Sequence, residues 1–174
     1  MLGQLDLWGK NKVEVAIERI RMFEPKEGYY LAFSGGKDSQ CIYHLAEAAG
    51  VKFSAHYRVT SVDPPELVRF IKTQYPDVKL DVPKREDGTP ATMWNLIPTR
   101  QMPPTRIVRY CCQILKETGG QGLVTMTGVR WAESANRQAN QGLVTMPKKS
   151  KKLKQTLTEN GVNFQKTMRG GGWF

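Results

Sequence analysis

Hydrophobic positions along the chain switch between two spacings, which predict helices and strands in turn. Apolar side chains in residues 13–22 recur at helical spacing, whereas residues 29–33 form a continuous apolar run typical of a central parallel strand. Helical spacing returns in residues 41–49, where we expect Cys41 in the core, and Gly50 ends this helix. The chain therefore begins as helix, strand and helix.

The next segment repeats the strand–helix order. Apolar and polar residues alternate through residues 51–60, which indicates a strand with one apolar face. Asp63-Pro64-Pro65-Glu66 predicts a helix start, with Asp63 as the capping residue and an apolar stripe that ends at Tyr75. Residues 78–82 predict a third, short strand.

The remaining pattern completes an α/β arrangement. Helices are predicted at residues 92–102 and 106–117, separated by Pro103-Pro104, and a last strand at residues 123–129. Alternating strands and helices favour a Rossmann-like parallel sheet with helices on both faces. Ligands of such sheets bind at the carboxyl ends of the strands.

A glycine loop joins the first predicted strand to its helix, with the sequence Ser34-Gly35-Gly36-Lys37-Asp38-Ser39. Amide groups at a helix start and its positive dipole end attract anions, and glycines let the backbone approach them closely. The two serines add hydroxyl donors, and Lys37 adds a positive charge. Asp38 suits a phosphate site where Mg²⁺ lies between carboxylate and phosphate. The loop predicts a site for nucleotide phosphates or pyrophosphate, with a plain glycine turn as the alternative.

Length and composition indicate one globular domain over residues 1–174. The chain is 40% hydrophobic, and its longest apolar runs are too short to cross a bilayer. Residues 1–12 lack the layout of a signal peptide, and three cysteines do not make a disulfide framework. We therefore expect a cytoplasmic protein with no membrane partner.

The net charge of +10 favours anionic partners. Five lysines gather in Lys148–Lys154, within a segment that we interpret as a basic loop or insert over residues 138–160. Such a run is either a solvated surface or a contact for RNA or DNA.

Two further blocks contain candidate site residues. Cys111 and Cys112 are adjacent, and they are either small hydrophobes or partial metal ligands, because a thiolate-held cluster needs about four cysteines. Arg130 and Arg137 are seven positions apart, so they share a face if a helix forms there. Arg130 follows a predicted strand and can contact a phosphate or sulfate with two donors, although surface pairing with glutamate is the alternative. Ser34, residues 60–63 including Asp63, and Arg130 all follow strand ends, so we expect them to converge.

Together the blocks resemble the phosphoadenosine phosphosulfate (PAPS) reductase family of the PP-loop ATP pyrophosphatases. The glycine loop matches the S-G-G-x-D-S signature. Cys111 to Lys116 is similar to the C-C-x-x-[RL]-K segment, and Gly128 to Arg137 to the G-x-R-x-x-E-S-x-x-R segment. The resemblance covers residues 28–140.

The resemblance implies an adenine nucleotide alpha-hydrolase-like fold that binds ATP, PAPS or adenosine phosphosulfate (APS) with Mg²⁺. Lys37 and Arg130 are the expected catalytic residues. The nucleotide-binding residues would be Ser34, Gly35, Gly36, Lys37, Asp38, Ser39, Asp63, Arg130 and Arg137, with Asp38 also placing Mg²⁺.

The implied chemistry is sulfur metabolism, with two reactions open. The chain either processes a sulfated adenosine nucleotide, as a reductase-like oxidoreductase, or splits ATP into an adenylate and pyrophosphate. No cysteine follows Cys112, whereas reductases of this family carry a nucleophilic cysteine near the C-terminus, and Lys37 is similar to the ATP-splitting relatives. The alternatives are a component of tRNA thiolation or DNA phosphorothioation that contacts nucleic acid through Lys148–Lys154, and a non-catalytic nucleotide-binding module.

We expect the chain to be incomplete as a catalyst. Cys111 and Cys112 lack enough cysteine partners for an iron–sulfur cluster, and the sequence ends at a glycine run before Trp173-Phe174. Truncation at the C-terminus, a second subunit or a homo-oligomer would supply what is missing, including any further cluster ligands.

Overall fold

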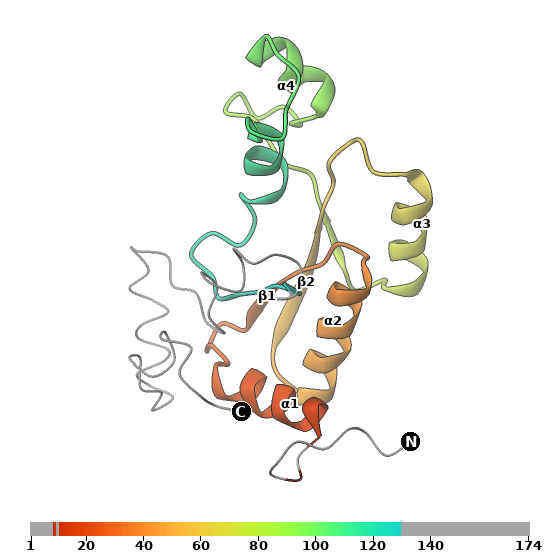
Figure 1. Cartoon of the computed structure of the whole chain (residues 1–174), viewed down its shortest axis with the longest axis vertical. Helices are drawn as coiled ribbons and strands as arrows, with labels where there is room; N and C mark the ends of the chain where they lie inside the picture. The colour runs from red at the N-terminus through yellow and green to blue at the C-terminus, as the bar shows by residue number, and fades with distance from the viewer. Residues whose placement is uncertain (1–8, 10, 130–174) are drawn as a thin grey trace.

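The structure, a computed structural model, describes residues 9 and 11–129, which form an α/β fold (Figure 1). Four parallel strands build its sheet in the order β3-β2-β1-β4. The inner strands are β1 (Tyr29–Ala32) and β2 (Phe53–Arg58), and the edge strands are β3 (Lys79–Asp81) and β4 (Thr125–Met126). The predicted Rossmann-like parallel sheet is confirmed.

One face of the sheet packs against three helices. These are α1 (Lys12–Met22), α2 (Lys37–Ala49) and α3 (Pro65–Gln74). The shared core joins strand residues to α2 and α3, with α1 packed against it through partly buried side chains. Its members include Leu31 and Tyr57 from the strands, Tyr43 and Ala46 from α2, and Ile71 from α3.

The chain between β3 and β4 forms a second, smaller unit. It contains α4 (Met93–Arg100) and a π-helix, η1 (Cys112–Lys116), around a core of Ala91, Leu96, Tyr110 and Leu115. Figure 1 shows α4 at the end of the molecule opposite α1. The side chain of Arg58 connects this unit to the sheet by donating from Nε to the Leu115 carbonyl oxygen, at 3.3 Å.

The predicted helix over residues 106–117 is wrong in its first half. After Pro103-Pro104 the chain makes a turn in which the Thr105 amide donates to the Val108 carbonyl, at 3.1 Å, and Ile107 is 92% exposed. Helical structure begins only at residue 110 and widens to the π form, closed by the Glu117 amide donating to Cys112. Prolines without amide donors and a threonine-stabilised turn favoured the loop over the helix.

Three smaller expectations also need correction. Cys41 is exposed rather than in the core, because α2 turns Tyr43 and Ala46 toward the sheet. The cap of α3 is Pro64, with no side-chain hydrogen bond, so Asp63 does not cap it. The strand expected at residues 123–129 is paired only at Thr125–Met126.

None of the helices that the structure describes combines the length and apolar composition needed to cross a membrane.

Candidate functional site

The glycine loop occupies the place that the sequence predicts, between the end of β1 and the start of α2. Its serines stabilise the turn internally. The Ser34 hydroxyl donates to the Ser39 hydroxyl, at 3.2 Å, and the Ser39 hydroxyl donates to the Gly36 carbonyl, at 2.8 Å. Ser39 is buried and Ser34 is exposed. Buried Ser39 therefore stabilises the loop conformation, whereas exposed Ser34 can also contact a ligand.

The two glycines of the loop have different roles. Gly35 has a φ of +74°, and a Cβ there would lie 2.6 Å from Cδ1 of Leu67 on α3. Gly36 has an ordinary φ of −76°, and the nearest atom to an added Cβ is the Ser34 hydroxyl oxygen, at 3.5 Å. The conformation thus requires glycine at position 35, whereas glycine at position 36 only leaves space above the loop.

The start of α2 can receive an anion. Gly36 is the capping residue, and no side chain caps this helix, so its first amides are not satisfied in the usual way. Lys37 is exposed and Asp38 is half-buried in the first turn. Helix-start amides without a side-chain cap, next to an exposed lysine, suit phosphate oxygens, and the Asp38 carboxylate is an oxygen ligand that fits Mg²⁺.

The end of β4 approaches this loop, as the sequence predicts for the third motif. A Cβ added to Gly128 would lie 2.9 Å from the carbonyl carbon and oxygen of Asp38. The backbone just after β4 therefore touches the first turn of α2. Only a residue without a side chain permits this approach, which explains the glycine that opens the motif Gly128-Val129-Arg130.

Asp63 lies after β2, at the same edge of the sheet, but its side chain is engaged. One carboxylate oxygen, Oδ2, accepts hydrogen bonds from the hydroxyls of Tyr57 and Thr60, both at 2.6 Å. Burial opposes ionisation, yet these two bonds and the charge of Lys116 together lower the pKa of Asp63 below its usual value. Asp63 thus anchors the loop after β2, and its predicted contact with the nucleotide stays a prediction.

Sequence reasoning missed the residues that support this edge. Ser61 has a φ of +65°, and its hydroxyl oxygen accepts a hydrogen bond from the Met93 amide at the start of α4, at 3.0 Å. Thr60 is almost fully buried, and the charge of Lys116, just after the cysteine pair, acts on Asp63. The only signal in the sequence was that residues 60–63 follow a strand; their partners are distant along the chain.

The cysteine pair lies in the second unit, where the two thiols differ. The Arg109 guanidinium donates from Nη2 to the Cys112 sulfur, at 3.4 Å, and this bond lowers the pKa of Cys112. Burial and the neighbouring Cys112 raise the pKa of Cys111. Within the described residues no three His, Cys, Asp or Glu side chains gather as a metal site. A cluster at these cysteines stays a prediction that depends on other ligands.

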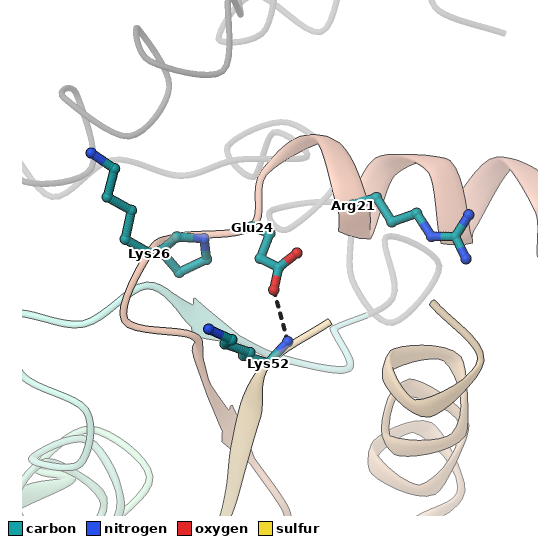
Figure 2. Close-up of a pocket in the computed structure, with 5 residues that line it drawn as sticks. Arg21, Glu24, Lys26 and Lys52 are labelled. Atoms are coloured by element: carbon teal, nitrogen blue, oxygen red, sulfur yellow. Dashed lines mark hydrogen bonds between the residues drawn. The ribbon is translucent and has the colours of Figure 1, made fainter. Parts of the chain in front are cut away.

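Two hollows lie away from the glycine loop. One, of about 260 Å³, is lined by Arg21, Glu24, Pro25, Lys26 and Lys52. It adjoins the segments that lead into β1 and β2, at the opposite end of the strands from Ser34. Figure 2 shows that Glu24 turns to the Lys52 amide, whose hydrogen bond to Oε1 measures 2.8 Å, while Arg21 and Lys26 extend away. The second, of about 320 Å³, includes Arg109 and belongs to the second unit.

Several predicted site features lie outside the described residues. These are Arg130, Arg137, the basic segment 138–160 and its lysines Lys148–Lys154. Comparisons of the chain with protein families, with curated proteins and with solved structures find no match.

Proposed function

We propose that this chain binds an adenine nucleotide through Ser34–Ser39 and acts in sulfur metabolism as a PAPS reductase-like PP-loop protein. One observation carries the proposal: the glycine loop opens α2 without a side-chain cap, at the carboxyl end of an inner strand of a parallel sheet. Exposed Lys37 and half-buried Asp38 in the first turn of α2 support the proposal, because they offer a positive charge for phosphates and an oxygen ligand for Mg²⁺.

Two further observations support a nucleotide site at the edge of the sheet where the strands end. Gly128 touches the backbone of Asp38, which brings the start of the arginine motif to the loop. Hydrogen bonds from Tyr57 and Thr60, together with the charge of Lys116, lower the pKa of Asp63, which favours a carboxylate in the loop after β2. The glycine loop and the described start of the arginine motif thus adjoin each other at one edge of the sheet.

Calorimetry tests nucleotide binding directly. ATP and PAPS would be titrated into the protein with and without Mg²⁺. Replacing Lys37→Ala should weaken binding about tenfold or more, because an ammonium–phosphate contact is a strong charge-assisted hydrogen bond. Lys72→Ala is the matched control. Lys72 is exposed in the last turn of α3, and its replacement removes the same positive charge away from the glycine loop. Equal affinity in both variants, or no binding of any adenosine nucleotide, would contradict the proposal.

Two assays distinguish the two candidate reactions. If the chain splits ATP, an acceptor attacks the α-phosphorus and pyrophosphate leaves, with Lys37 and Arg130 stabilising the developing charge. If it reduces a sulfated nucleotide, sulfite is released at the expense of an added dithiol. Pyrophosphate release without sulfite favours the first reaction, and the reverse favours the second. Nucleotide binding with neither product would identify a non-catalytic nucleotide-binding module.

The second candidate function is delivery of sulfur to RNA or DNA, favoured by the net charge of +10 and the lysines of Lys148–Lys154. Replacing these lysines with glutamine should weaken salt-sensitive binding to nucleic acid and leave nucleotide affinity unchanged. If binding to nucleic acid does not change, the lysines of Lys148–Lys154 form only a solvated surface.

A further inference from the structure

The unit between β3 and β4 exposes an unusual set of side chains. We call residues 91–118 the arm; it holds α4 and η1 around its own small core. Trp94 on α4 is 75% exposed and Ile107 is 92% exposed. Met102 and Val108 are also exposed, at 40% and 42%. The large hydrophobic residues of the arm are thus divided between a buried core and an outer surface.

The arm also carries more basic than acidic residues. Within residues 91–118 the basic residues are Arg100, Arg106, Arg109 and Lys116, and the only acidic residue is Glu117. Arg100 and Arg106 are exposed, and neither forms an ion pair with any residue that the structure describes. Exposed guanidinium groups and an exposed indole within one small unit complement a partner that offers both negative charge and flat apolar faces.

Single-stranded nucleic acid has this combination, with phosphates for the arginines and unstacked bases for Trp94. In a duplex the bases are already stacked, so the indole would gain less. A membrane surface would favour one continuous amphipathic helix, yet the exposed apolar residues here come from both eight-residue α4 and the loop after it. Charge complementarity also disfavours a second copy of this basic arm.

We propose that the arm is a docking surface for single-stranded nucleic acid, with Trp94 as a base-stacking platform and Arg100 and Arg106 as phosphate contacts. The Met93 amide, next to Trp94, is tied to Ser61 in the loop after β2. This bond brings the backbone at the start of α4 to the loop after β2, an inner strand of the sheet. This surface is separate from the lysines of Lys148–Lys154.

Fluorescence anisotropy of the full chain with labelled oligouridylate and oligothymidylate tests the proposal. Trp94→Ala should weaken binding about tenfold, whereas Trp94→Phe should retain most of the affinity because a phenyl ring still stacks. Arg106→Gln should weaken binding and reduce the slope of log affinity against log salt by about 0.7, as one lost phosphate contact predicts for a single strand. A matched duplex should bind less tightly than either oligonucleotide.

The matched control for Arg106→Gln is Arg69→Gln, an exposed arginine on α3. Circular dichroism would confirm that each variant is folded, and Lys37→Ala should bind the oligonucleotides normally, which separates this test from that of the nucleotide site. The proposal is overturned if Trp94→Ala binds as the wild type does, or if Arg69→Gln weakens binding as much as Arg106→Gln. It is also overturned if Trp94→Ala changes only the mass measured by light scattering or only the affinity for anionic vesicles.

Discussion

The two faces of the sheet are packed differently, one by apolar side chains and the other by polar contacts. On one face, the register partners Leu31 and Ala55 pack with Tyr57 against α2 and α3. On the other, the Tyr30 ring stacks on His56 with centroids 4.4 Å apart, and His56 Nδ1 lies 2.8 Å from an Asp81 carboxylate oxygen. The first face is fixed by apolar burial and the second by specific polar contacts.

A pair of tyrosines shows what this difference means. Tyr57 points into the apolar face and still satisfies its hydroxyl, which donates to Asp63. Tyr30, on the polar face, is 6% exposed, and its hydroxyl has no partner at hydrogen-bond geometry among the described residues. Burial and the nearby Asp81 carboxylate raise the pKa of this hydroxyl. Gly119 and Gly120 close over its ring. Polar surroundings therefore do not guarantee a satisfied group, because geometry decides each bond.

Leu31→Ala should cause the largest loss of stability. Leu31 is fully buried at the centre of the apolar face, so its truncation leaves a cavity in a core closed by three helices. We expect the free energy of unfolding to fall by about 3–5 kcal/mol, measured by chemical denaturation. Ser54→Ala, at the register position beside Tyr30 on the other face, is the comparison and should change stability little. Similar losses in both variants would show that the two faces are equally packed.

Gly120→Ala tests how closely the polar face is covered. Gly120 and Gly50 share a φ of +68°, but an added Cβ at Gly120 would lie 2.7 Å from the Tyr30 ring, whereas nothing lies within 4 Å at Gly50. Gly50→Ala should therefore cost only the backbone strain, about 1 kcal/mol, and Gly120→Ala about 2–4 kcal/mol. Equal losses of unfolding free energy would mean that the 118–122 segment moves away from Tyr30 without cost.

Removing one hydroxyl from each tyrosine should have opposite effects. Tyr57→Phe leaves the Asp63 carboxylate with one donor fewer and should lower the free energy of unfolding by about 1–3 kcal/mol. Tyr30→Phe removes a buried group without a partner and should be neutral or stabilising by about 1 kcal/mol. Parallel denaturation curves of the two variants make the comparison. A destabilised Tyr30→Phe would reveal a partner for that hydroxyl.

The smallest expected effect is a pH dependence through Asp63. Because the pKa of Asp63 is lowered in the folded protein, the unfolded chain takes up the proton first as the pH falls. The stability that Asp63 contributes is present above its unfolded pKa of about 3.9 and is lost below it. The stability gap between wild type and Asp63→Asn should thus shrink as the pH falls from about 6 to about 3. A gap that is constant over this range would contradict the assignment.

Local patterns predicted the elements well where periodicity and packing agree. The alternation in residues 51–60 placed β2, and the apolar run of residues 29–33 became an inner strand of the sheet. The glycine loop was found at its place because its residue types, the strand before it and the helix after it are all local signals. The first half of the helix predicted over residues 106–117 was wrong because a turn around Thr105 and Val108 competed with a helical pattern.

The sequence by itself determined the α/β order, the glycine loop and the surplus of basic residues, since each depends on neighbours along the chain. Tertiary structure alone decided that Gly128 touches Asp38, that Tyr57 and Thr60 hold Asp63, and that Trp94 is exposed. These contacts join residues whose side chains must first be brought together by strand order and by the path of the arm. Periodicity gives the face that a residue occupies, but only packing between distant segments decides which partner it meets there.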